Sequence, residues 1–386
     1  MPKPKTPPAL WSFLFGNLII GTGIMLPAGL LNVFMADLGL DAPTAGLLSF
    51  VGGMVVGLGA PLVAGFTSGI DRRFLLATAL MLYVVGHIGA ALSPSFSLIL
   101  VFRAITVAGA AIFTPQAAAT VGLLVPPAQR GGAIAFIFIG WSLASVLGIP
   151  LGTLLGDWIG WRGTYLCMAG LSAVGVISVW LTVPKGLKVA PLRLSSWVQV
   201  LTDWRLLLVL AVTLLVGSGQ TSVFIYMTPV LAKVYGASVS QIALTFLAGG
   251  ICGVAGNIAV ARFATRIGAA RGAMASMVLV LVAMGLIWAF WGQYWVLLGA
   301  VCLWQIGGFA VNSFQQGRLV ALAPALASAT VAMNTSVVYL GQAVGAKTGG
   351  ALVRDAFTPA LPAAAMLFVI AGMITSVLAS ARQPRP

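Results

Sequence analysis

Long apolar runs follow one another through almost all of this 386-residue sequence. A membrane-spanning helix takes roughly 20 consecutive apolar residues. Runs of about that length occupy 11–36, 44–67, 74–92, 97–121, 132–155 and 163–183, and then 206–231, 241–264, 273–291, 294–318, 330–352 and 361–379. Only 7% of the residues are charged, which is too few to cover the surface of a water-soluble domain of this length. The sequence therefore predicts an all-α integral membrane protein with twelve transmembrane helices.

A longer polar stretch separates the first six runs from the last six. It contains several basic residues, among them Lys185, Lys188 and Arg205. We therefore predict a six-helix N-terminal half at 1–183, a linker at 184–205 and a six-helix C-terminal half at 206–386.

The distribution of charge predicts the orientation. With the N-terminus in the cytoplasm, most of the 20 Lys and Arg residues fall on the cytoplasmic side, and Arg162, Lys233 and Arg354 fall outside. Such asymmetry is typical of an even number of spans with both termini in the cytoplasm. The net charge of +14 is thus explained by topology, and we expect no nucleic-acid partner. The N-terminal residues lack the features of a removable signal peptide, so the expected location is the bacterial inner membrane.

Glycine spacing indicates an internal repeat. Small residues four apart share one face of a helix, where two backbones can approach closely. Corresponding spans of the two halves carry such series: Gly148, Gly152 and Gly156 against Gly341, Gly345 and Gly349, and Gly53 and Gly57 against Gly249 and Gly253. Duplicated halves are a design found in transporters.

The reactive residue types are scarce. The chain has one His, three Cys and six acidic residues, all of them Asp. This composition offers no metal-binding cluster, disulfide framework or catalytic constellation. We therefore expect no cofactor and no enzymatic activity, and the lack of a large soluble domain weakens the alternative of a receptor.

The segment that runs from Gly148 through Pro150, Gly152 and Gly156 to Arg162 resembles the antiporter motif of the major facilitator superfamily. The resemblance covers the whole chain and is closest to the twelve-span drug:proton antiporter branch with its sugar- and purine-efflux relatives. It implies a bundle of two six-helix halves. For the motif residues themselves, close helix packing is the main expectation, with gating as the alternative.

A loop motif of the same family is present in degraded form after the second run. Arg72 and Arg73 keep its closing basic pair, but Ser68 stands where the family has an Asp. The resemblance implies a latch between helix ends on the cytoplasmic side, and the missing acid puts a charge-based latch in doubt.

The family's packing implies that runs one, four, seven and ten line a central cavity. Polar side chains are costly in lipid, so those on the inner runs are candidate substrate-binding residues. They are Asn17, Asn32, Arg103, Gln116, Gln220, Tyr226, Trp304, Gln305, Asn312, Gln315, Asn334, Tyr339, Gln342 and Lys347. The alternative is that they hold helices together through hydrogen bonds worth about 0.6 kcal/mol each.

Proton-coupled transporters usually titrate a carboxylate or His inside the membrane, and no carboxylate falls near the middle of a run. The remaining candidates are Arg103, which resembles the family's fourth-span arginine, Lys347 and His87. Each has a structural alternative: snorkelling to the interface for Arg103 and Lys347, and packing for His87. A positively lined cavity would favour anionic or neutral solutes.

The leading hypothesis is a secondary active exporter of a small organic solute or drug that works by alternating access with protons as the coupling ion. The alternative is an uncoupled facilitator or importer of a polar or anionic metabolite. The expected partners are the solute, the bilayer and protons, and we expect the protein to act as a monomer.

Overall fold

The computed structural model describes residues 7–67, 69–188, 194–354 and 356–381, so Ser68 of the loop motif lies outside the described residues. All regular structure in these ranges is helical, which confirms the predicted class. The N-terminal half contains α1 (Pro8–Gly29), α2 (Leu31–Leu38), α3 (Ala42–Phe66), α4 (Arg72–Leu92), α5 (Phe96–Leu124), the short turn η1 (Pro127–Gln129) and α6 (Arg130–Thr182).

The C-terminal half follows the same order after a short helix, α7 (Leu194–Thr202), in the predicted linker. It contains α8 (Trp204–Phe224), α9 (Met227–Val234), α10 (Val239–Ile267), α11 (Ala269–Ala289), α12 (Tyr294–Leu322), η2 (Pro324–Leu326), α13 (Ala327–Leu352) and α14 (Ala360–Ala381). The order of long and short elements therefore repeats, including the 3-10 turn before α6 and before α13.

Ten segments of the described chain are long and apolar enough to cross a membrane. The 53-residue α6 contains a break at Gly160, whose φ of 72° and ψ of 169° are not helical, so it supplies two crossings. The left-handed φ suits glycine, which has no side chain to clash. The polar helix α13 packs between α8 and α3 and completes the twelve spans.

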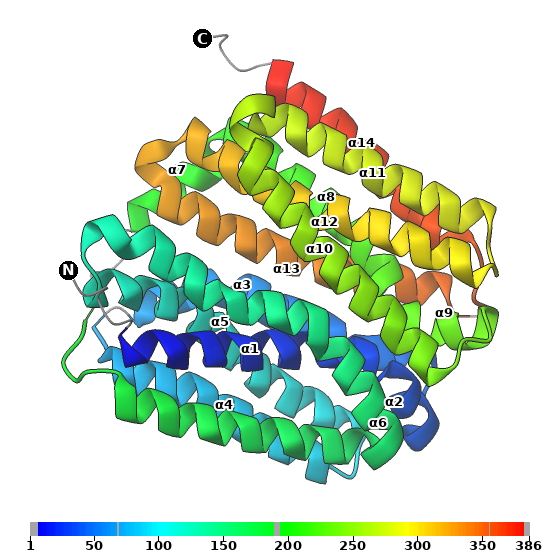
Figure 1. The fold of residues 1–386 in the computed structure, drawn as a ribbon, viewed down its shortest axis with the longest axis horizontal. Coiled ribbons are helices and arrows are strands. Elements are labelled where there is room, and N and C mark those ends of the chain that lie inside the picture. The colour runs from blue at the N-terminus through cyan, green and yellow to red at the C-terminus, as the bar shows by residue number, and fades with distance from the viewer. Residues whose placement is uncertain (1–6, 68, 189–193, 355, 382–386) are drawn as a thin grey trace.

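The first span of each half is split near its far end. The first break follows α1 at Leu30 and the second follows α8 at Ile225 and Tyr226. Sequence patterns predicted single runs here, because both sides of each break are apolar. The consequence is a pair of short helices, α2 and α9, at one end of the bundle (Figure 1).

Figure 1 shows the two halves as separate groups of helices, with both chain ends on the side away from α2 and α9. We call the two ends of the bundle the terminal end and the α2–α9 end. Between the halves, α3 packs against α13 and α6 packs against α10. Each pairing joins the second span of one half to the fifth span of the other, so the interface follows the repeat.

The halves are joined most tightly at the α2–α9 end. The buried apolar cluster of the C-terminal half takes in Leu31, Ala42, Ala45 and Ile149 from the N-terminal half. Among the described residues, the hydrogen bonds that cross between halves also lie toward this end: Asn32 to Thr228, Thr228 to Ala28 and Gln342 to Ser49. At the terminal end, the cluster around Val200 and Leu319 contains residues of the C-terminal part alone.

The α3–α13 contact depends on Gly53. A Cβ atom at this position would lie 2.5 Å from the Tyr339 carbonyl oxygen and 2.7 Å from the Ala343 nitrogen. Both are backbone atoms of a packed helix and cannot move aside as a flexible side chain can. The glycine is therefore required for the two halves to approach as closely as they do.

We predict that Gly53→Ala lowers the melting temperature of the purified protein, because forcing the halves apart costs about 1–3 kcal/mol. The matched control is Gly59→Ala in the same helix, where the nearest atom, the Ala111 Cβ, is 3.8 Å away. Tryptophan fluorescence during heating measures the melting temperatures of both variants. Equal melting temperatures for the two variants would contradict the assigned contact.

Candidate functional site

Arg103 lies inside the N-terminal half, with only 3% of its surface exposed. Its guanidinium donates three hydrogen bonds to backbone carbonyls: Nη1 to Gly23 at 2.7 Å, Nη2 to Ile24 at 3.0 Å and Nε to Leu48 at 3.3 Å. The side chain thus connects α5 to both α1 and α3. It does not extend to the end of its span, so the snorkelling alternative is wrong.

Pro27 in α1 explains why carbonyls are available to Arg103. Proline has no N–H, so the carbonyl four residues earlier, that of Gly23, loses its helical partner. An unpaired carbonyl in the membrane costs several kcal/mol, and a buried cation costs roughly 2.5–3.5 kcal/mol. The Arg103–Gly23 hydrogen bond offsets both costs. It fixes the helix just before the α1–α2 break.

Aromatic side chains surround this arginine. Tyr83, Tyr165 and Tyr339 lie within electrostatic range of the guanidinium, and Tyr339 comes from the C-terminal half. His87 is 1% exposed, and its Nδ1 lies 2.8 Å from the Tyr83 carbonyl oxygen. The Tyr165 hydroxyl is buried without a hydrogen-bond partner among the described residues. His87 therefore lies inside the half, next to the arginine, and not at its periphery.

Two similar polar clusters occupy corresponding places in the halves. In the first, Thr114 donates to Asn17 at 2.9 Å, and the Asn17 amide donates to a backbone carbonyl of α6 at 3.1 Å. In the second, Thr213 donates to Asn334 at 2.8 Å, and Asn334 donates to Asn312 at 2.9 Å. Each cluster joins the first, fourth and fifth spans of its half. Asn17, Asn312 and Asn334 thus hold helices together.

Three other predicted binding residues lie at the contact between halves. The Asn32 amide donates to the Thr228 carbonyl at 3.3 Å, and the Gln342 amide donates to the Ser49 carbonyl at 3.3 Å. The Tyr226 hydroxyl donates to the Ala346 carbonyl at 2.8 Å and lies directly against Gly46 of α3. These side chains close the α2–α9 end.

Two predicted glutamines partner buried arginines near the terminal end. Gln116 accepts a hydrogen bond from Arg72, whose Nη2 also donates to the Thr67 carbonyl at 3.0 Å. Gln315 accepts from Arg318 at 3.1 Å. Arg318 also donates to the hydroxyls of Ser376 at 2.8 Å and Ser380 at 3.1 Å.

Sequence reasoning placed Arg72 in a loop and Arg318 at the end of its run, but they are 1% and 4% exposed. A usable signal existed for Arg318, because Gln315 precedes it by three residues and shares its helix face.

Gln220 forms a cluster with aromatic rings, which we call the aromatic–amide cluster: Gln220, Phe224, Phe246 and Trp304. The Trp304 indole donates to the Gln220 side chain at 2.8 Å, and the Phe224 ring centre lies 6.1 Å from that of Trp304 and 5.6 Å from that of Phe246. Gln305 faces Gly249 of α10. The two phenylalanines were not predicted, because nothing in an apolar run marks them out.

Lys347 is exposed on α13, near the α2–α9 end, which agrees with the snorkelling alternative and not with a buried titratable lysine. The motif glycines of α6 pack on the first span: a Cβ at Gly148 would meet Thr22, one at Gly152 would meet Leu26 and one at Gly156 would meet Leu30. Pro150 is buried beside them. The motif therefore packs α6 against α1, as the main expectation stated.

The family model of the Major Facilitator Superfamily matches residues 13–346. The chain belongs to this superfamily. Its members move small molecules across membranes and are not enzymes, and the chain is accordingly a multi-pass membrane transporter.

The chain is similar to several bacterial members. It is 27% identical to the inner membrane transport protein YdhP of Escherichia coli over 381 residues, which cover 97% of this chain and 96% of that protein. It is 32% identical over 246 residues to a chloramphenicol resistance protein of Streptomyces lividans, with 61% and 62% covered. A probable sugar efflux transporter of Helicobacter pylori is 27% identical over 344 residues, with 89% and 88% covered.

A solved structure supports the fold. The D-xylose–proton symporter superposes with a TM-score of 0.76 over 96% of both chains at 15% identity. At this identity the likeness concerns the fold alone.

We predict that Arg103→Lys destabilises the protein, although the charge is kept. One ammonium cannot reach carbonyls of both α1 and α3 in the fork geometry of a guanidinium, and an unpaired buried carbonyl costs about 1–3 kcal/mol. The melting temperature measures this. The matched control is Arg162→Lys, an exposed arginine of the same half. If both substitutions lower the melting temperature by the same small amount, the assigned role of Arg103 in bonding the carbonyls of α1 and α3 is wrong.

Proposed function

We propose that this transporter is a secondary active exporter of a small neutral or anionic organic solute in the bacterial inner membrane, with both chain ends in the cytoplasm and with one chain as the working unit. The aromatic–amide cluster is the observation that carries the proposal. The efflux relatives support the direction of transport, and the predicted charge asymmetry supports the orientation.

The charges of the described spans support the substrate class. Arg72, Arg103 and Arg318 are buried in or near the spans, whereas Asp37, Asp41, Asp71 and Asp203 lie at helix ends or in turns. Buried cations without nearby carboxylates repel a cationic solute and attract an anionic one. Trp304, Phe224 and the amide of Gln220 suit a solute with a flat apolar part and polar edges.

The cluster around Arg103 is our candidate for proton coupling. His87 is the buried imidazole of that cluster, and the Tyr165 hydroxyl has no hydrogen-bond partner among the described residues and is available to an incoming water or proton carrier. Protonation beside the fixed arginine would favour a different packing of α4 against α5. The exposed position of Lys347 makes it the weaker candidate.

A facilitator without proton coupling is the second candidate. The specific observation in its favour is that the described spans offer no central carboxylate to titrate. Solute-dependent acidification or alkalinisation of loaded liposomes distinguishes the two, because an uncoupled facilitator moves no protons with its solute.

We predict that a solute panel tested in proteoliposomes under a pH gradient contains at least one neutral or anionic compound that moves faster than in empty liposomes. For that compound, Trp304→Ala raises the apparent KM about tenfold, since the loss of roughly 1.4 kcal/mol of binding is tenfold. Gln220→Ala, which leaves the indole N–H unpaired, acts in the same direction.

The matched control for this experiment is Trp295→Ala, since Trp295 is 73% exposed at the start of the same helix. Transport of cations alone would contradict the substrate class. An unchanged KM in Trp304→Ala, with transport intact, would exclude the aromatic–amide cluster as the binding site.

A further inference from the structure

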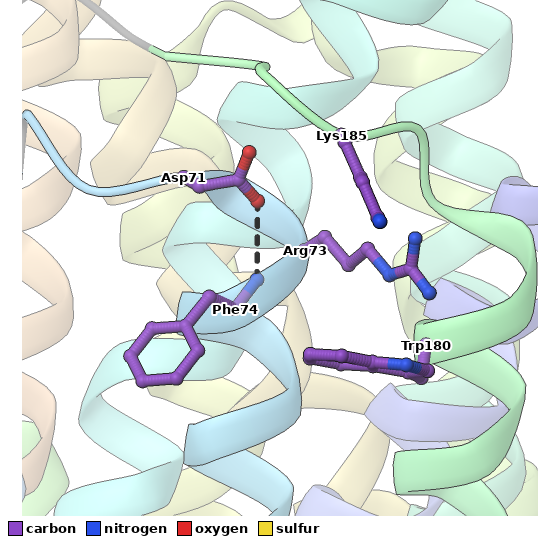
Figure 2. A pocket seen from close by; sticks show the side chains of 5 residues that line it. All are labelled: Asp71, Arg73, Phe74, Trp180 and Lys185. Atoms are coloured by element: carbon purple, nitrogen blue, oxygen red, sulfur yellow. Dashed lines mark hydrogen bonds between the residues drawn. The ribbon is translucent and has the colours of Figure 1, made fainter.

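A surface pocket of about 270 Å³ lies at the terminal end, where α4 begins and α6 ends. Asp71, Arg73, Phe74, Trp180 and Lys185 line it (Figure 2). Because α4 starts at Arg72 and α6 ends at Thr182, the pocket lies at the level of the bilayer surface. None of its residues belongs to the aromatic–amide cluster or to the Arg103 site.

Asp71 forms one wall of this pocket, and its carboxylate oxygens are bonded to backbone N–H groups and not to the cations of the pocket. One carboxylate oxygen accepts the Phe74 N–H at 3.2 Å and caps α4, and the other accepts the Gly186 N–H. Burial would raise the pKa of this carboxyl, but the hydrogen bonds from Gly186 and Phe74 and the charge of Arg73 bring the pKa below its ordinary value. The ionised Asp71 thus holds the start of the linker against α4.

Two cations converge in the pocket, and neither of them forms an ion pair with Asp71. The Arg73 guanidinium lies 4.5 Å above the Trp180 ring, and its Nε is buried with no hydrogen-bond partner. Figure 2 shows the Lys185 ammonium directed toward this guanidinium. Among the described residues, the single ion pair is the distant one between Asp37 and Arg162. Like charges held together by stacking and backbone geometry repel each other unless an anion lies between them.

We propose that this pocket binds the phosphate group of an anionic membrane lipid. A stacked guanidinium and an ammonium are the groups that proteins use most for phosphate. The surroundings favour a lipid as the source: Trp180 is 45% exposed and Phe74 is 57% exposed, so both present apolar surface beside the charges. Tryptophan is enriched at this depth of the membrane, and anionic lipids attract basic groups there.

A lipid in this pocket would bridge three parts of the chain. Arg73 belongs to α4, Trp180 to α6 and Lys185 to the linker between the halves. The Arg72 backbone N–H donates to the Leu187 carbonyl at 2.9 Å. This bond holds the linker, and with it Lys185, beside the start of α4, where the headgroup would bind. Binding should therefore stabilise the folded protein.

The test uses the full-length protein in detergent, titrated with phosphatidylglycerol or with phosphatidylcholine. We expect phosphatidylglycerol to raise the melting temperature and phosphatidylcholine to leave it unchanged, because binding to the folded state stabilises it. The double variant Arg73→Gln/Lys185→Gln should weaken the apparent affinity for phosphatidylglycerol by about tenfold or more.

The matched control is Arg205→Gln. Arg205 also lies over an indole, that of Trp204 at 5.7 Å, but it has no place in the pocket. The affinity of the Arg205→Gln variant for phosphatidylglycerol should stay within about twofold of that of the wild type. If the double variant does not fold, Lys185→Gln alone serves, since Lys185 is exposed.

Further arms of the test separate the sources of phosphate. Inorganic phosphate and glycerol phosphate, added without lipid, should not protect the protein at the concentrations at which phosphatidylglycerol does. Equal protection by these soluble anions would overturn the lipid assignment. Equal affinity of wild type and the Arg73 and Lys185 variants for phosphatidylglycerol would overturn the site itself.

Discussion

The hydrogen bond from Arg103 to the Gly23 carbonyl is the interaction on which the first half depends. Pro27 leaves that carbonyl without a helical donor, and the membrane supplies no water to replace one. The Arg103 guanidinium donates a hydrogen bond to this carbonyl. In all, three carbonyl oxygens stabilise the buried positive charge. Because α1 is held at this point, the chain turns at Leu30 and places α2 against α9. The closed end of the bundle thus follows from a proline and an arginine that are 76 positions apart in the printed sequence.

The repeat explains both how the halves are built and how they meet. Within each half, a polar cluster joins the first, fourth and fifth spans, through Asn17 and Thr114 in one and through Asn334 and Thr213 in the other. Between the halves, the helix backbones approach closely at glycines such as Gly53, which have no side chain to interlock with the other half. Strong bonds within halves and few bonds between them suit two bodies that rock against each other, as the proposed alternating access requires.

The sequence was sufficient for the all-α membrane class, because span length follows from the thickness of the bilayer, and for the family, because the segment from Gly148 to Arg162 resembles its motif. It was not sufficient for the site. Amides in an apolar run look alike, and the environment of each depends on which helix face turns inward. Asn32, Tyr226 and Gln342 therefore lie at the junction of the halves, and Gln116 and Gln315 lie beside buried arginines. Phe224 and Phe246 had no signal at all, since phenylalanine is ordinary in a membrane span.

Alternating access requires the α2–α9 end to open during transport, and a cross-link across that end tests this most directly. Asn32 and Thr228 meet across the halves: the Asn32 side-chain amide lies 3.3 Å from the Thr228 backbone carbonyl oxygen, and the Thr228 hydroxyl donates to the Ala28 carbonyl. In a variant without Cys167, Cys252 and Cys302, Asn32→Cys and Thr228→Cys would be joined by a short thiol reagent and transport of an identified solute followed in liposomes. The account predicts that transport stops in the cross-linked protein and returns after reduction. Undiminished transport with the cross-link fully formed would contradict it.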